Sequence, residues 1–248
     1  MNLDEEVCKE VVRRAYRLDF DTVYKMIGDK PFILAGGSLC GDAVHDYDLY
    51  PVQGREYDIA QLSVHLQLGK CPVKGVEWLA KTRNALTVRL PNKQVVQFCR
   101  YSKPTLKELV DSFDFSHIQV GVEFKGEGDP PHADAVYYTK AFLLAGVTRR
   151  TEYTGSEYPL GSAIRVMKYW QRGRLTKAAA TRAVVKALAD VLERGYRDYN
   201  DFKDQMDAID LGLPDCAEMR LLYDAAHKRG LVRDPDKASD HSQGGGDE

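Results

Sequence analysis

Two kinds of hydrophobic pattern alternate in the first part of the chain, and only one occurs in the second. Up to Tyr138, short runs rich in Val, Leu, Ile and Phe, typical of strands, alternate with segments that have apolar residues at helical spacing. From Thr139 onward, every periodic segment has helical spacing. The pattern predicts an α+β fold, with an α/β domain at residues 1–145 that begins with helices and a helical domain at residues 146–232.

The ends of several predicted elements carry the expected capping residues. Gly28 and Gly173 follow predicted helices, where a left-handed conformation is common. Val184, Leu188 and Leu192 recur at i, i+4 and i+8 and predict an apolar helix face. The predicted helices cover residues 4–17, 21–27, 57–68, 104–112, 139–147, 159–172, 178–195 and 214–228. The predicted strands cover residues 31–35, 85–90, 94–98, 115–124 and 135–138, with one more that carries Asp46.

The composition is that of an ordinary globular protein. Of 248 residues, 44% are hydrophobic and 29% are charged, and the net charge of −2 weakens the expectation of a nucleic-acid substrate. Five cysteines without a Cys-x-x-Cys pair indicate neither a zinc site nor a disulfide framework. The acidic N-terminus is no signal peptide, and no apolar run could span a bilayer. We expect a cytoplasmic protein with no membrane partner, and a disordered tail at residues 233–248.

The candidate chemistry begins where the first predicted strand ends. A small-residue turn, Gly36, Gly37 and Ser38, follows the strand, and Asp46 and Asp48 come shortly after it. A glycine turn lets backbone N–H groups approach a phosphate closely. Residues at i and i+2 of a strand point to one face, so the two carboxylates would project together and could hold Mg²⁺. The alternative is an ordinary turn followed by a solvated or capping pair of acids.

The order of these residues resembles the signature of the nucleotidyltransferase superfamily, the polymerase-β-like fold. In that family a hydrophobic strand, Gly-Gly or Gly-Ser and a short helix lead to a strand with two acids. The resemblance runs from about residue 30 to about residue 175, and its later part is similar to uncharacterised phage, viral and fungal members. The stretches that carry this later part are Asn84–Val88, Val95–Arg100, Ser112–Phe115 and Arg165–Gly173.

The resemblance implies a mixed β-sheet flanked by helices and a transferase that uses Mg²⁺ or Mn²⁺. It would move a nucleoside monophosphate from an NTP such as ATP to a hydroxyl acceptor and release pyrophosphate. Asp46 and Asp48 would be catalytic metal ligands, and a third carboxylate is expected. Gln97 stands where many relatives carry that acid, so Asp114, which matches the Phe-Asp of virus-type members, is the favoured third ligand, with Glu123 a weaker substitute.

The predicted nucleotide-binding residues come from two places. Gly36, Gly37 and Ser38 would hold the β- and γ-phosphates through N–H groups and the hydroxyl. A basic row on one face of the helix at 159–172 would grip the triphosphate, and its tyrosine could stack on the base; a solvated face is the alternative. The residues of this row are Arg165, Lys168, Tyr169 and Arg172. Further candidates just before a predicted strand are Thr82, Arg83 and Asn84.

Rival functions follow from the same residues. Gln97 in place of an acid favours a catalytically weakened nucleotide-binding or antitoxin-like module. Action on an RNA 3′ end, such as that of tRNA, is disfavoured by the near-neutral charge and acidic tail. A metal phosphohydrolase is disfavoured because the histidines have no metal-type spacing. The NTP is the expected partner, the acceptor could be a small molecule, a protein or RNA, and a phage-encoded protein would act in the host cytoplasm.

Overall fold

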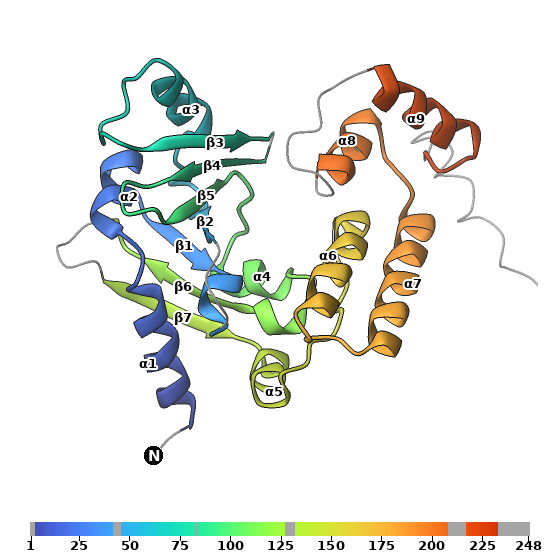
Figure 1. The fold of residues 1–248 in the computed structure, drawn as a ribbon, viewed down its shortest axis with the longest axis horizontal. Coiled ribbons are helices and arrows are strands. Elements are labelled where there is room, and N and C mark those ends of the chain that lie inside the picture. Colours follow the sequence, from blue (N-terminus) through green and yellow to red (C-terminus); the bar gives the residue numbers. More distant parts are fainter. Residues whose placement is uncertain (1–2, 42–45, 83, 127–131, 208–216, 233–248) are drawn as a thin grey trace, which may run out of the picture. The chain divides into compact units, whose positions relative to one another are not determined.

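The computed structural model describes residues 3–41, 46–82, 84–126, 132–207 and 217–232. The chain has an α+β fold and divides into two compact units (Figure 1). The predicted tail, residues 233–248, lies outside the described residues, and the predicted domain boundary after residue 145 stays a prediction. The first unit comprises Met1–Gly155 and Gly173–Leu175, and the second comprises Ser156–Arg172 and Thr176–Glu248.

A seven-stranded mixed sheet forms the centre of the first unit, so the mixed sheet that the resemblance implies is confirmed, with one strand more than the pattern predicted. Its strand order is β3-β4-β5-β2-β1-β6-β7, and β2 with β5 is the parallel pair among the described ladders. The β4–β5 hairpin confirms the predicted hairpin. The strands are β1 (Phe32–Ala35), β2 (Tyr47–Pro51), β3 (Glu77–Lys81), β4 (Ala85–Arg89), β5 (Val95–Cys99), β6 (Val120–Phe124) and β7 (Ala133–Tyr138).

Helices cover both faces of this sheet (Figure 1). The larger core lies on the face of α1, α2 and α3, where Phe32 and Phe124 are fully buried and the rings of Phe20 and Phe124 lie 4.6 Å apart. The smaller core lies under α4, which packs on Ile33 and Ala35. The helices of this unit are α1 (Leu3–Ala15), α2 (Phe20–Ile27), α3 (Ile59–Gln67), α4 (Leu106–Asp111) and α5 (Lys140–Thr148), with 3₁₀ turns η1 (Gly37–Leu39) and η2 (Ser116–Ile118).

Strand alternation decides which side chains of β2 face α4. Tyr47 and Leu49 belong to the larger core, and Tyr50 packs against the smaller one. Because successive residues of a strand point to opposite faces, Asp48 lies on the α4 face together with Tyr50. Asp48 is half-buried there, whereas Tyr47 is buried.

Two parts of the sheet differ from the predicted elements. Strand β3 was not predicted, because its side chains are mostly exposed and lack the alternation of a half-buried strand. The predicted strand at 115–124 begins only at Val120, since the residues before it form η2. Asp46 directly precedes β2 instead of lying within it.

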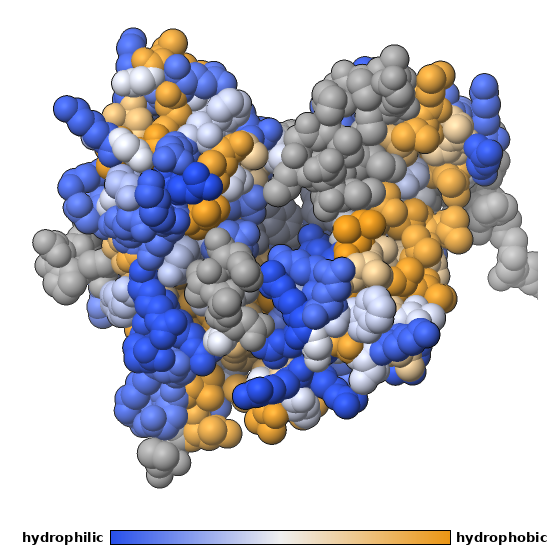
Figure 2. Space-filling view, viewed as in Figure 1, coloured by the Kyte–Doolittle hydropathy of each residue, from blue (hydrophilic) through white to orange (hydrophobic). Residues whose placement is uncertain are grey.

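The second unit is helical, as the pattern predicts. Thr176 caps α7 by accepting a hydrogen bond from the N–H of Ala179. The predicted apolar face of α7 is wrong in position, because the small residues Ala180, Ala183 and Ala187 are buried while Leu188 is 44% and Leu192 is 66% exposed. Figure 2 shows hydrophobic surface over this helix. The helices are α6 (Pro159–Gln171), α7 (Lys177–Arg194), α8 (Tyr199–Asp207) and α9 (Ala217–Lys228).

No helix in the described part of the chain is both long enough and apolar enough to cross a membrane.

Candidate active site

The predicted glycine turn leaves β1 in a backbone conformation that favours glycine. Gly36 has φ 86° and ψ −141°, a region that side chains with a Cβ rarely adopt. Its N–H donates to the carbonyl of Val120 at 3.0 Å, which extends the pairing of β1 with β6 by one residue. The chain then turns directly into η1, so the start of this 3₁₀ turn lies at the end of β1.

Contacts with α1 and η2 fix η1 in place. The guanidinium of Arg14 on α1 donates to the carbonyl of Leu39 at 2.9 Å and to Glu10 at 2.8 Å. The thiol of Cys40 lies 2.8 Å from the carbonyl oxygen of His117 and 3.2 Å from that of Gly36. The turn is therefore held by α1 and η2. No sequence pattern marks Arg14 for this contact.

The first backbone N–H groups of η1 do not take part in the hydrogen bonds within the turn. The bonds of the turn are donated by Leu39 to Gly36 and by Cys40 to Gly37, so the N–H groups of Gly37 and Ser38 lie ahead of them. The hydroxyl of Ser38 is buried and has no hydrogen-bond partner among the residues that the structure describes. A buried hydroxyl of this kind is uncommon, because leaving it unpaired costs about 1–3 kcal/mol.

Asp48 lies directly beside the glycine turn. In the β1–β2 ladder Ala35 is the partner of Asp48, so the carboxylate stands next to the first residue of the turn. A Cβ on Gly36 would lie 3.6 Å from Oδ2 of Asp48. The structure therefore brings the predicted turn and one of the two predicted acids together.

Asp46 and Asp48 influence the same neighbour. Burial raises the pKa of the Cys99 thiol well above its ordinary value, and the negative charges of Asp48 and Asp46 raise it further. Asp46 itself is exposed at the start of β2. Both carboxylates are thus close enough to the Cys99 end of β5 to act on it electrostatically.

An amide occupies the sheet position next to Asp48. Gln97 is the partner of Asp48 in the parallel β2–β5 ladder, and its Nε2 donates to the hydroxyl of Thr87 at 3.3 Å. Asp114 follows α4 and is 5% exposed, and its carbonyl accepts the N–H of Thr154 at 2.9 Å. Glu123 pairs with Ile33 instead, two residues farther along the sheet than the Ala35–Asp48 pair.

The acids fit a metal that keeps part of its water shell. Within the described ranges no group of three or more His, Cys, Asp and Glu side chains is arranged to hold a metal ion, so Asp114 as third ligand stays a prediction. Mg²⁺ is commonly held by one or two carboxylates together with water and substrate phosphates. The oxygen donors of Asp46 and Asp48 suit that mode of binding.

The predicted basic row lies on α6 of the second unit. Val166 and Tyr169 are buried, Lys168 and Arg172 are exposed, and a guanidinium nitrogen of Arg165 lies 3.4 Å from the hydroxyl of Ser162. The spacing does not produce a uniformly exposed basic face, because the tyrosine at its centre is buried. The role of these four residues in nucleotide binding stays a prediction.

The further candidates before β4 have separate positions. The hydroxyl of Thr82 accepts the N–H of Asn84 at 3.2 Å and that of Ala85 at 3.0 Å, which forms a turn between β3 and β4. Thr82 also lines a cavity of the first unit. Arg83 lies outside the described residues.

Comparisons with known proteins give matches only among solved structures. No protein-family model matches the sequence, and no curated protein matches it. One match is the Thermotoga maritima CCA-adding enzyme complexed with tRNA, with 14% identity over 88% of this chain and 53% of that one and a TM-score of 0.47. A CCA-adding enzyme with CTP has 13% identity, coverages of 93% and 56%, and a TM-score of 0.48.

A third match is a tRNA-processing enzyme with CTP, at 14% identity, coverages of 83% and 56%, and a TM-score of 0.41. The chain spans about half the length of these structures. At these identities and TM-scores, the matches assign neither a reaction nor a substrate to this chain. The resemblance to phage and viral members stays a prediction.

Proposed function

We propose that the protein is a metal-dependent nucleotidyltransferase that moves a nucleoside monophosphate from an NTP to a hydroxyl acceptor and releases pyrophosphate. The observation that supports this most is the contact between the turn and the acid. A Cβ on Gly36 would lie only 3.6 Å from Oδ2 of Asp48, so a phosphate on the turn would lie beside a carboxylate that can hold its cation.

The residues of the turn would bind the phosphates. The N–H groups of Gly37 and Ser38 are outside the helical bonding of η1, and the Ser38 hydroxyl is buried without a partner in the described part of the chain. Phosphate oxygens accept hydrogen bonds from such groups at the start of a helical turn. The turn would orient the triphosphate, while the contacts of Arg14 and Cys40 hold the turn in place.

Asp46 and Asp48 would hold Mg²⁺ or Mn²⁺, with Asp114 as the proposed third ligand. The metal would neutralise charge on the phosphates, which is the main requirement of phosphoryl and nucleotidyl transfer. On the second unit, Arg165, Lys168, Tyr169 and Arg172 are proposed to bind the nucleotide. An adenine nucleotide is the first substrate to test.

The test distinguishes transfer of the nucleotide from transfer or hydrolysis of phosphate. The protein is incubated with Mg²⁺, a cell extract as the acceptor source and ATP labelled at either the α- or the γ-phosphate. Nucleotidyl transfer labels an acceptor from α-labelled ATP only. Asp48→Asn should lower the rate at least about a hundredfold, the scale of losing one electrostatic contact to the transition state.

A matched control replaces an acid that is remote from the turn. Asp21 is exposed and pairs with Lys25 on α2, so Asp21→Asn should leave the rate unchanged. Equal labelling by wild type and Asp48→Asn, or labelling from the γ-phosphate, would contradict the proposal. Adding tRNA as a defined acceptor tests whether an RNA 3′ end is the substrate, and small-molecule and protein fractions of the extract test the other acceptors.

A second function is favoured by the residue next to Asp48. Gln97 is the strand partner of Asp48, at a position where a carboxylate could complete a metal site. A module that binds NTP without turnover, in the manner of an antitoxin, would need only the turn and the two acids. Calorimetry with ATP and Mg²⁺ separates the two functions, because tight binding without labelling of any acceptor supports the module.

A further inference from the structure

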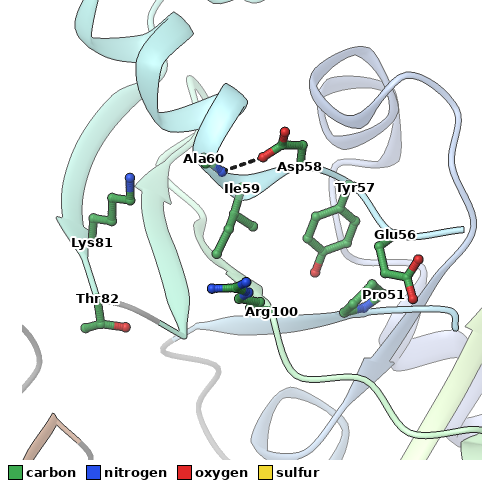
Figure 3. A pocket seen from close by; sticks show the side chains of 9 residues that line it. All are labelled: Pro51, Glu56, Tyr57, Asp58, Ile59, Ala60, Lys81, Thr82 and Arg100. Carbon is green, nitrogen blue, oxygen red and sulfur yellow. Dashed lines mark hydrogen bonds between the residues drawn. The ribbon is translucent and has the colours of Figure 1, made fainter. Parts of the chain in front are cut away.

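The first unit contains a cavity of about 570 Å³ at the edge of the sheet where β2, β3 and β5 end. Ligand pockets of proteins have volumes of about 300–1,000 Å³, so this cavity could hold a molecule of nucleotide size. One side is apolar and is formed by Pro51, Tyr57 and Ile59. The lining also includes Lys81, Thr82 and Arg100, which come from the ends of β3 and β5. Figure 3 shows Lys81 and Thr82 together and Arg100 below Ile59.

Lys81 and Arg100 are the two cations that line the cavity. Neither Lys81 nor the guanidinium of Arg100 forms an ion pair with a residue that the structure describes. Backbone hydrogen bonds hold the chain at both strand ends, because the N–H of Arg100 donates to Asn84 at 2.7 Å and that of Thr82 donates to Ala85 at 2.8 Å. Two cations that line one cavity, without an ion pair to a described residue, attract an anion.

The acids of the cavity are directed to backbone groups. Asp58 accepts the N–H groups of Ala60 and Gln61 at 2.8 and 3.0 Å and so caps α3. Glu56 accepts the N–H of Gly54 at 2.8 Å, a bond that lowers the pKa of its carboxyl. Figure 3 shows Glu56 on the far side of Tyr57 from Lys81. The acids therefore leave Lys81 and Arg100 available.

This cavity is distinct from the glycine turn and its acids. Asp48 pairs with Ala35 near the start of β2, whereas Pro51 at the other end of the strand lines the cavity. Three residues along a strand correspond to about 10 Å. The side chains of Tyr57 and Ile59 also belong to the larger core, on the sheet face opposite to that of Asp48.

We propose that the cavity binds a small phosphate monoester, with its phosphate on Lys81 and Arg100 and its organic part against Pro51, Tyr57 and Ile59. Arginine and lysine together bind phosphate through charge-assisted hydrogen bonds, and the arginine can bind in a bidentate manner. The apolar wall adds affinity for a ligand that carries a ring. The site does not include the metal-binding acids and needs no divalent cation.

The experiment measures binding of AMP, adenosine and inorganic phosphate to the full chain by calorimetry at low ionic strength in EDTA. AMP should bind at least tenfold more tightly than either adenosine or phosphate, and its affinity should fall as salt is added. The Lys81→Gln/Arg100→Gln variant should bind AMP at least tenfold more weakly. Both residues are exposed, and an unchanged circular dichroism spectrum and thermal midpoint would confirm that the variant folds.

Two further variants locate the site. Lys177→Gln/Arg182→Gln makes the same change of charge at exposed positions of α7 and should bind AMP like the wild type. Asp48→Asn, which should slow transfer, should leave metal-free AMP binding unchanged, so failure of one proposal is distinguishable from failure of the other. Unaltered binding by Lys81→Gln/Arg100→Gln, equal affinities for AMP and phosphate, or loss of binding in Asp48→Asn would overturn the cavity proposal.

Discussion

Replacing Gly36 by alanine tests whether the backbone of the turn requires glycine. The residue has φ 86° and ψ −141°, where a Cβ clashes with the residue's own backbone. A Cβ would contact only Oδ2 of Asp48 within 4 Å, at an ordinary distance of 3.6 Å. The expected loss of stability is therefore backbone strain, about 1–3 kcal/mol, without an added term for steric overlap.

Gly37→Ala provides a control one residue away. Gly37 has no positive φ, and a Cβ there would meet no atom within 4 Å. Alanine at a compatible position restricts the unfolded chain, so this variant should be neutral or more stable by up to about 1 kcal/mol. The two substitutions add the same methyl group to adjacent residues. They should change the stability in opposite directions, because Gly36 has a positive φ and Gly37 does not.

The assay must report on the first unit alone. The chain has two tryptophans, Trp78 on β3 and Trp170 on α6. In a Trp170→Phe background, fluorescence during urea unfolding follows Trp78. Each kcal/mol should also lower the midpoint of thermal unfolding by about 2–4 °C for a unit of this size. A loss below about 0.5 kcal/mol for Gly36→Ala, or an equal loss for Gly37→Ala, would refute the strain argument.

Three other changes test packing and charge. Gly121→Val should cost about 1–3 kcal/mol, measured by urea unfolding, because a Cβ at this position would lie 2.8 Å from Cδ1 of Leu106. Arg14→Met should cost about 1–2 kcal/mol in the same assay, since it removes the hydrogen bond to η1. Asp201→Asn should cost about 1.5–3 kcal/mol, followed by helical circular dichroism, because Asp201 is buried and accepts a hydrogen bond from Arg194 at 2.8 Å. Burial alone would raise the pKa of Asp201, but hydrogen bonds from neighbouring arginines lower it, so the difference from wild type should shrink as the pH falls below the ordinary value of 3.8.

Elements with a strong local pattern could be predicted from the sequence. The β4–β5 hairpin and helices α5 and α6 lie close to their predicted ranges, because turn residues and caps such as Thr139 mark their ends. Strand β3 lacked such a signal, since an edge strand with exposed side chains has neither alternation nor an apolar run. In α7, alanines are buried and leucines are exposed, so the larger apolar residues gave the wrong face.

Part of the candidate site could be predicted because its residues form a local sequence pattern. The glycine turn and Asp48 lie within one short segment, and strand pairing of β1 with β2 brings them together. Arg14, Gln97 and Lys81 come from elements distant in the sequence. Their contacts depend on the strand order and register of the whole sheet, which no local pattern specifies.

The position of β2 determines which parts of the site can move. It is the central strand of seven and is hydrogen-bonded on both sides, to β1 and to β5. Its amides should therefore exchange with deuterium only when the entire first unit unfolds. The backbone of Asp48 is a rigid wall, so any motion that admits a substrate or releases a product must come from other segments.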